Sequence, residues 1–266
     1  MADSRLPAPS FALVASTPEL THTPPMALLV YFATFALFSV IFTREVIAPA
    51  SQATCNKRWR LYAGSLTAAT LVAVVAAGFL FDRWIDSHSL FALRERLDVV
   101  SASLVAFLVS SLVAYGYHRA VHASDRLWRW VHQLHHSPTR IEALTAFYVH
   151  PFDALLAALL NAGVAYLVLG VSGVSAGLAL AYVAVFNLVA HADMRTPWQL
   201  GFFLQRPEMH RVHHERGSHR NNYGLPLWDM VFGTWRNPRV GPAQCGFVDD
   251  KERLIGQMLR LKDVEG

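Results

Sequence analysis

The sequence is poor in charged residues, in cysteine and in nucleotide-binding glycine motifs. Asp, Glu, Lys and Arg make up 16% of its 266 residues, compared with about 25% in soluble domains, which argues against a soluble globular protein. The two cysteines, Cys55 and Cys245, stand alone, so neither a disulfide nor an iron–sulfur cluster is expected. A Gly-rich dinucleotide fingerprint is also missing.

The sequence is instead rich in long apolar runs. Hydrophobic residues account for 53% of the chain, in runs at 26–42, 61–81 and 99–117 and in a longer run at 154–190. Each of the first three is about long enough to cross a hydrocarbon core of about 30 Å. Residues 170–173 (G-V-S-G) divide the last run into two spans or a hairpin. We therefore predict an all-α, integral membrane helical bundle, because a soluble protein would need several helices that are apolar on every face.

Basic residues predict the orientation of this bundle. The loop after the first run carries Arg44, Lys57, Arg58 and Arg60 against one acid, Glu45, whereas residues 82–98 hold three arginines and four acids. Cytoplasmic loops carry the excess of Lys and Arg, so the first loop is expected inside and the second outside. Five spans then place the carboxyl terminus and every histidine cluster on the cytoplasmic side. The net charge of +4 lies on membrane flanks, which favours anionic lipid headgroups over nucleic acid.

Nine histidines form three clusters and one outlier, His191. Spacings of three and four residues place side chains on one face of a helix. H-R-A-V-H at 118–122, H-Q-L-H-H at 132–136 and H-R-V-H-H at 210–214 each present two or three imidazoles together. Imidazole is the commonest protein metal ligand, and nine of them exceed the three or four that one zinc ion needs. The pattern predicts a histidine-rich cap that holds two metals.

Turn and cap residues predict where the helices of this region begin and end. Ser124 and Asp125 can cap the helix that carries the second cluster, the Ser-Pro pair at 137–138 can end it, and Pro151 suits the first turn of the next helix. Residues 198–204 form a short amphipathic stretch, which fits the membrane interface and core packing equally well.

Several common chemistries do not fit these clusters. A zinc protease of the H-E-x-x-H type needs Glu directly after the first histidine, and that residue is Arg119. A serine or cysteine hydrolase would need a nucleophile elbow or a well-placed thiol. A dinuclear site with neutral nitrogen ligands beside a membrane suits iron and dioxygen, which can attack an unactivated C–H bond.

The order of the motifs resembles the sterol desaturase/fatty acid hydroxylase superfamily of integral membrane di-iron enzymes. The resemblance rests on the three clusters, the single histidine after a hairpin, and the N-Y-G, W-D and F-G-T motifs, and it covers residues 99–235. It implies nine metal ligands: His118, His122, His132, His135, His136, His191, His210, His213 and His214. Some members carry another histidine four residues before the position of His191. Here that residue is Asn187, so one metal would have fewer protein ligands or a water.

The resemblance also implies an activity. We expect an O2-dependent oxidoreductase that hydroxylates, or secondarily desaturates, a fatty-acyl lipid or sterol-like molecule. Its cofactors would be two iron ions, with O2 as co-substrate, and zinc can replace iron on purification because it outcompetes Fe(II) at nitrogen ligands. A separate cytochrome, ferredoxin or reductase would supply electrons.

The chain is expected to divide into four parts. A polar segment at 1–25, without the signature of a cleaved signal peptide, precedes membrane spans at 26–98. A catalytic domain at 99–240 and a tail at 241–266 follow.

Other polar residues carry weaker expectations. His150 is expected to anchor the entrance of a span, His219 to be solvated, and His22 and His88 to be incidental. Four acids are candidates to hold the second ring nitrogen of ligating histidines, although capping or surface ion pairs explain them nearly as well: Asp125, Asp193, Glu208 and Asp229. Tyr117 and Trp128 either line a lipid route or pack in the core.

Two other classes of function remain open from the sequence. A metal transporter would place histidines within the spans along a pathway, whereas these cluster beyond the span ends. A non-catalytic, lipid- or metal-binding relative would be expected to lose cluster histidines, and all three clusters are intact.

Overall fold

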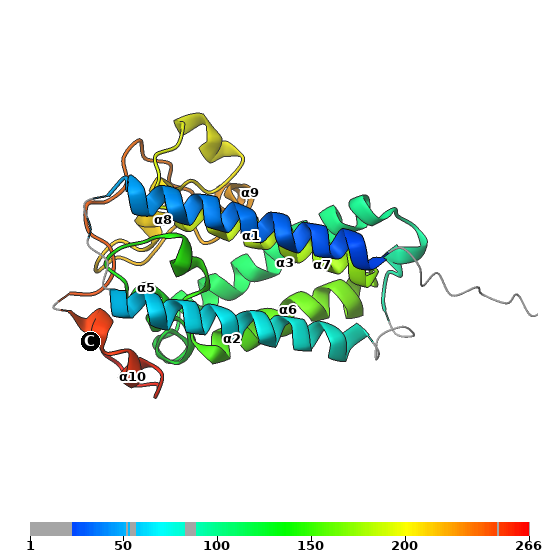
Figure 1. Cartoon of the computed structure of the whole chain (residues 1–266), viewed down its shortest axis with the longest axis horizontal. Coiled ribbons are helices and arrows are strands. Elements are labelled where there is room, and N and C mark those ends of the chain that lie inside the picture. Colours follow the sequence, from blue (N-terminus) through cyan, green and yellow to red (C-terminus); the bar gives the residue numbers. More distant parts are fainter. Residues whose placement is uncertain (1–22, 52, 54–56, 83–88, 249, 266) are drawn as a thin grey trace, which may run out of the picture.

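The computed structural model describes residues 23–51, 53, 57–82, 89–248 and 250–265. Within these ranges every regular element is helical, apart from one isolated bridge between Glu215 and Cys245. Five long helical segments run along the long axis of the molecule (Figure 1). They are α1 (Thr23–Ile47), α2 (Lys57–Asp82), α3 (Val99–His122), α6 (Pro151–Ala162) with its π-helical continuation η4 (Gly163–Leu169), and α7 (Gly173–His191).

Four of these segments are long and apolar enough to cross a membrane: Leu29–Ile47, Val99–His122, Pro151–Leu169 and Gly173–His191. The run at 154–190 thus forms two spans, and the predicted all-α membrane bundle is confirmed. The helix α2 coincides with the remaining predicted span, 61–81, but is not among the four. The side chains of its residues 74–75 and 77–82 lie outside the described part of the chain, and the five-span topology stays a prediction.

The break between the last two spans has a local cause. Gly170 adopts the left-handed conformation with φ of 63°, and a Cβ at this position would overlap the Ser89 side chain, so glycine is required. Ser172 then caps α7 by accepting a hydrogen bond from the Ser175 N–H at 3.2 Å.

The spans pack through small residues. The helix α7 packs against both α1 and α3, and α2 packs against α6. Ala102 and Ala106 of α3 and Ala176 and Ala179 of α7 are buried in one cluster with the π-helical segment η4. Small side chains allow backbones to approach closely, which is the usual source of helix association in lipid.

The short helices gather mainly at one end of the bundle, where α1, α3 and α7 end and where α2 and α6 begin (Figure 1). They are α4 (Asp125–Leu127), η2 (Trp128–His132), α5 (Gln133–His136), η3 (Ala143–Phe147), η5 (Trp198–Phe202), α8 (Pro207–His213), α9 (Pro226–Val231), η6 (Lys251–Arg253) and α10 (Ile255–Met258). A further short helix, η1 (Leu93–Glu95), precedes α3. The chain therefore places all three histidine clusters at the same end.

A buried ionic network ties the spans together at this end. Glu45 of α1 is fully buried and accepts hydrogen bonds from the backbone N–H groups of Ala143 and Asp193, each at 2.9 Å. Arg140 lies 3.2 Å from Glu142 and 3.4 Å from Asp193. The network joins the end of α1, the segment before η3 and the end of α7. Removing one member would leave a buried charge without its partner, which is strongly destabilising.

The predicted helix boundaries agree with the structure. Ser124 caps α4, α5 ends at His136, and Pro151 begins α6. Cys245 is buried and unpaired. Cys55, His22 and His88 lie outside the described residues, as does the polar segment at 1–22.

Candidate metal centre

The first two clustered histidines lie at the end of α3. His118 and His122 are four residues apart, so the helix presents both rings on one face, and their ring centroids are 5.0 Å apart. Trp128 packs on the other side of His122 at a centroid distance of 5.0 Å.

The second cluster lies on a helix that changes its winding. After α4, residues 128–132 form the π-helical turn η2, and the chain returns to α-helix in α5. A π-turn places one extra residue in a helical turn and is frequent at functional sites. His132, His135 and His136 follow one another from this turn into α5, and all three are buried.

The remaining histidines come from the last span and from α8. His191 is the last residue of α7. The helix α8 begins with Pro207, whose missing N–H suits the first helical turn, and it carries His210 and His213, with His214 directly after it. These rings are also buried.

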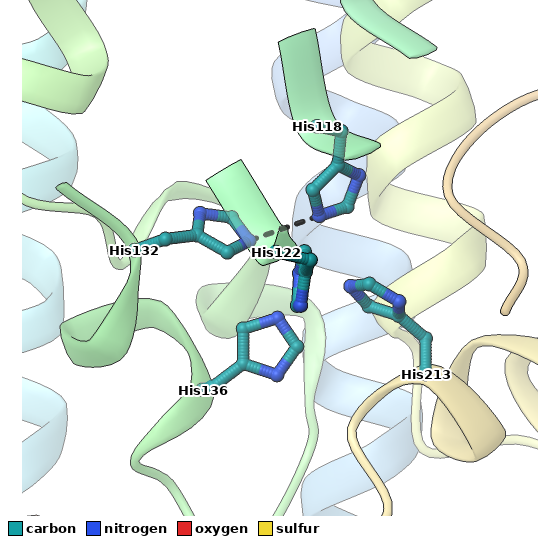
Figure 2. A group of neighbouring side chains, drawn as sticks. All are labelled: His118, His122, His132, His136 and His213. Carbon is teal, nitrogen blue, oxygen red and sulfur yellow. Dashed lines mark hydrogen bonds between the residues drawn. The ribbon is translucent and has the colours of Figure 1, made fainter. Parts of the chain in front are cut away.

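Five of these imidazoles converge on one point, as Figure 2 shows. They are His118, His122, His132, His136 and His213, and we call them the five-histidine group. One ring nitrogen of each lies within 4.8 Å of the corresponding nitrogen of every other. The shortest pair is Nε2 of His118 and Nε2 of His132, at 2.9 Å.

The other four imidazoles form a second, fully buried group: His135, His191, His210 and His214, here the four-histidine group. Nε2 of His191 lies 2.9 Å from Nε2 of His210 and 3.3 Å from Nε2 of His135. Nε2 of His214 lies 3.2 Å from Nε2 of His210. All nine histidines that the resemblance implied therefore fall into two groups.

The two H-H doublets of the sequence are split between the groups. His136 belongs to the five-histidine group and its neighbour His135 to the four-histidine group. In the same way, His213 joins the first group and His214 the second. The rings of His136 and His214 stack at 4.1 Å, so the two groups are in direct contact.

The ring nitrogens fit metal ligation. Nε2 of His122, His136 and His213 is buried and has no hydrogen-bond partner among the described residues, although an unpaired buried polar atom is costly. These atoms point into the five-histidine group. Close, buried nitrogen lone pairs repel one another unless a proton or a cation lies between them. A metal ion in each group would satisfy this arrangement.

Backbone carbonyls hold the opposite ring nitrogen of several group members. Nδ1 of His118 lies 2.6 Å from the carbonyl oxygen of Tyr223, and Nδ1 of His213 lies 2.8 Å from that of Asn221. Nδ1 of His191 likewise lies 2.8 Å from the carbonyl oxygen of Asn187. Each carbonyl can only accept, so it fixes the proton on Nδ1 and leaves the Nε2 lone pair for a metal.

A carboxylate performs this task for His132. Nδ1 of His132 lies 3.0 Å from Oδ2 of Asp153 in the first turn of α6, and the Tyr117 hydroxyl donates to Oδ1 of Asp153 at 2.7 Å. Sequence reasoning missed Asp153. The available signal was an acid in the first turn of an otherwise apolar span.

Among the described residues, the four acids suggested by the sequence make no hydrogen bond to the ring nitrogens of the two groups, so the first of the two interpretations given for them is not supported. Asp193 bonds Ser51, Glu208 bonds Thr196, and Asp125 lies in the first turn of α4. Asp229 accepts from the backbone N–H groups of Tyr223 and Gly224. It thereby steadies the loop whose carbonyl bonds His118, which is an indirect role.

The expectation that His219 is solvated is also wrong. His219 is buried, and its Nδ1 lies 3.1 Å from Nδ1 of His136. Its Nε2 lies 2.9 Å from Oε1 of Glu265 near the carboxyl terminus. The contact could not be predicted from the basic loop around His219, because Glu265 is 46 residues away in the sequence.

His150 has the structural role expected for it. Its Nδ1 accepts a hydrogen bond from the Phe152 N–H at 3.1 Å and caps α6. It belongs to neither histidine group. Asn187 contributes its backbone carbonyl to His191, and the group that contains His191 has four members instead of five.

Burial keeps these imidazoles neutral. Desolvation lowers the pKa of His135 to about 3 and lowers the pKa values of His136, His210, His213 and His214 well below 6.5. Neighbouring imidazoles lower them further, because a second positive charge would repel the first. Neutral rings at physiological pH are the form that binds a metal.

Comparison with known proteins agrees with this geometry. The family model for fatty acid hydroxylase matches residues 103–234. The chain is 30% identical to sphingolipid C4-hydroxylase sur2 of Schizosaccharomyces pombe over 50% of this chain and 47% of the relative. It is 27% identical to very-long-chain aldehyde decarbonylase GL1-9 of Oryza sativa subsp. indica (62% and 66%) and 26% identical to methylsterol monooxygenase 2-2 of Arabidopsis thaliana (70% of each).

The match to the first two relatives spans about half to two thirds of their length. No solved structure matches the chain. The matched region contains all nine histidines of the two groups. On the strength of the family model and these relatives, the chain belongs to the sterol desaturase/fatty acid hydroxylase superfamily.

Proposed function

We propose that this protein is a membrane-embedded di-iron oxygenase that hydroxylates a lipid C–H bond, with desaturation as the second possible outcome. The observation that carries the proposal is the pair of histidine groups, one buried and one partly buried, at the end of a membrane-spanning bundle. Relatives named as a sphingolipid hydroxylase and a methylsterol monooxygenase support a lipid substrate. The substrate would be a fatty-acyl lipid or a sterol-like molecule.

The nine histidines are the proposed ligands, with one iron in each group. Two bound iron ions would supply the O2 chemistry that amino-acid side chains cannot provide. The ligand set contains only neutral nitrogen donors. The five-histidine group offers one more nitrogen donor for a metal than the four-histidine group.

The chain itself orients the ligands and excludes water. Asp153 and the backbone carbonyls of Tyr223, Asn221 and Asn187 hold Nδ1–H groups, which keeps each Nε2 available for a metal. Trp128 packs against His122 and His136. The rings of the four-histidine group are fully buried, so a reactive centre there would be protected from bulk solvent.

The spans enclose a small pocket. A small, mostly apolar pocket between α3, α6–η4 and α7 is lined by Ser110, Ala158, Asn161, Ala162, Ala176 and Ala179. Along α3, Ser110 is about 12 Å from His118 at 1.5 Å per residue. The pocket therefore lies about two helical turns from the histidine groups along α3.

Electrons are expected from a separate cytochrome, ferredoxin or reductase, and the positive-inside distribution of basic residues favours a cytoplasmic position for that partner. The alternative of a metal transporter is less well supported. A transport pathway would need ligands at several depths, whereas the nine histidines lie in two contacting groups at one end of the bundle.

The proposal is tested by lipid mass spectrometry of cells with and without the protein, together with O2 uptake by the purified, iron-loaded enzyme. We expect a lipid product heavier by one oxygen atom or lighter by two hydrogen atoms, and no product from His213→Ala. Metal binding without a changed lipid and without O2 uptake would support the non-enzymatic alternative instead.

A further inference from the structure

Two short helices near the metal centre expose large apolar side chains. The exposed side chains are Leu200, Phe202 and Phe203 at η5 and Leu227, Met230 and Val231 at α9. We call this surface the η5–α9 face. Phe203 is 80% exposed and Val231 is 63% exposed. The two helices contact each other, so the side chains belong to one part of the surface. A cluster of exposed apolar side chains on a protein surface usually marks a site that contacts another molecule or a membrane.

The helix α9 is fastened to the side of a membrane span. The Trp228 indole N–H donates to Oγ of Ser111 in α3 at 2.8 Å. The ring of Phe232, directly after α9, stacks on Tyr115 of α3 with centroids 5.2 Å apart and planes 19° apart. Tyr115 also shares a hydrogen bond with Thr234 at 2.8 Å. These contacts fix the position of α9 along α3.

That position lies at membrane depth. Counted from Val99 at 1.5 Å per residue, Ser111 is about 18 Å and Tyr115 about 24 Å along α3. The hydrocarbon core is about 30 Å thick, and the polar residues Glu95, Arg96 and Asp98 come directly before α3. Both contact residues therefore lie within the thickness of the bilayer.

Arginines mark the level of the headgroups next to this face. Arg119 follows Tyr115 by one helical turn, is exposed, and places its guanidinium 5.8 Å from the Tyr115 ring centroid. The guanidinium of Arg239 lies 5.4 Å from the Trp198 ring centroid at η5. Arginine beside aromatic rings is typical of the membrane–water interface, where the cation meets lipid phosphate.

The polar groups of the α9 loop are satisfied inside the protein. Asp229 accepts hydrogen bonds from the N–H groups of Tyr223 and Gly224 through its carboxylate and from those of Thr234 and Trp235 through its carbonyl. Asp229 is itself fully buried. Non-helical backbone at membrane depth is tolerated only when protein groups satisfy it.

We propose that the η5–α9 face is inserted into the same leaflet that surrounds the histidine end of the spans, with α9 in the hydrocarbon and η5 at the headgroup level. The occupant of this face is therefore lipid. The insertion depends on the membrane position of α3 and not on the proposed oxygenase activity. It also has a functional consequence, because the loop between α8 and α9 bonds His118 through Tyr223, so leaflet lipid would border the five-histidine group.

The test uses the full chain, with Cys55 and Cys245 replaced by alanine, reconstituted in phosphatidylcholine–phosphatidylglycerol vesicles. A nitroxide is attached to Val231→Cys or, independently, to Met230→Cys. Leu104→Cys, on the exposed surface of α3, is the lipid control, and Gln257→Cys, on the exposed surface of α10, is the water control. The measurement is the accessibility of each nitroxide to O2, which concentrates in lipid, and to a water-soluble nickel chelate.

We expect Val231→Cys and Met230→Cys to match Leu104→Cys, with nickel accessibility several-fold below that of Gln257→Cys. Nickel accessibility equal to that of Gln257→Cys would overturn the proposal. Protection from both reagents that disappears when the protein is diluted with more lipid would also overturn it, because the face would then be covered by a second copy of the chain.

Discussion

His219 lies between His136 and Glu265, with nitrogen-to-nitrogen and nitrogen-to-oxygen distances of 3.1 Å and 2.9 Å. A carboxylate can only accept, so Nε2–H of His219 donates a hydrogen bond to Oε1 of Glu265. Nδ1 of His219 is then an acceptor for Nδ1–H of His136. This order of donors leaves Nε2 of His136, which has no partner among the described residues, free to bind a metal.

Removing this relay should weaken metal binding in the five-histidine group. We expect Glu265→Leu and His219→Ala to lower metal affinity about 10- to 100-fold, as removal of outer partners of metal-bound histidines commonly does. Glu265→Gln keeps an acceptor oxygen and should keep most of the affinity. The measurement is metal retained during titration with a chelator. Equal retention by the leucine and glutamine variants would contradict the relay.

Single histidine substitutions should separate the two groups. We expect His213→Ala to lose the metal of the five-histidine group and His135→Ala that of the four-histidine group, so that each variant falls from about two metals per chain to about one. Both should lose lipid turnover while still inserting in the membrane. Metal analysis of the purified variants tests this. One metal per chain in the fully active parent protein would refute the two-metal assignment.

His150 should affect stability and not metal content. Loss of its cap in His150→Ala is expected to cost about 1 kcal/mol, whereas Asn at the same position can still cap α6. Burial lowers the pKa of His150, so the folded state disfavours the proton that would abolish the cap. The stabilisation should therefore be complete above pH of about 6.5 and should be lost as the pH falls below it. Unfolding of the parent protein and of both variants between pH 5 and pH 8 measures the difference, and metal loss in His150→Asn would make His150 a ligand after all.

The orientation of the bundle can be tested with exposed positions at its two ends. In cells that express the chain with its natural cysteines replaced by alanine, Gln257→Cys should resist an impermeant thiol reagent and Glu95→Cys should react. Both residues are exposed, so burial does not protect them. The inverse labelling pattern would place the histidine groups outside and remove a cytoplasmic electron donor from the proposal.

The sequence predicted the parts of this molecule that depend on local periodicity. Apolar length located the spans, and i, i+3 and i+4 spacing located the histidines that the structure brings together. Gly170, Ser124 and Pro151 predicted helix ends because their effects act within a few residues.

Partners that are distant in the chain could not be predicted in this way. Asp153 meets His132 across 21 residues, and Glu265 meets His219 across 46. Nothing in the local pattern distinguishes these acids from Asp125, in the first turn of α4, or from Glu208, which pairs elsewhere. The contacts follow from how α6 and the carboxyl-terminal segment pack at the end of the bundle.

The two histidine doublets, His135–His136 and His213–His214, limit the distance between the two histidine groups. Because His135 and His136 are consecutive residues that serve different groups, a single peptide unit links one group to the other, and His213 and His214 provide a second such link. Peptide bonds are planar and stiff, whereas spans in a fluid bilayer tilt and slide. These two links therefore constrain the distance between the groups through bonds that do not lie in the spans. Two covalent links, one in each histidine doublet, thus limit how far apart the two groups can lie.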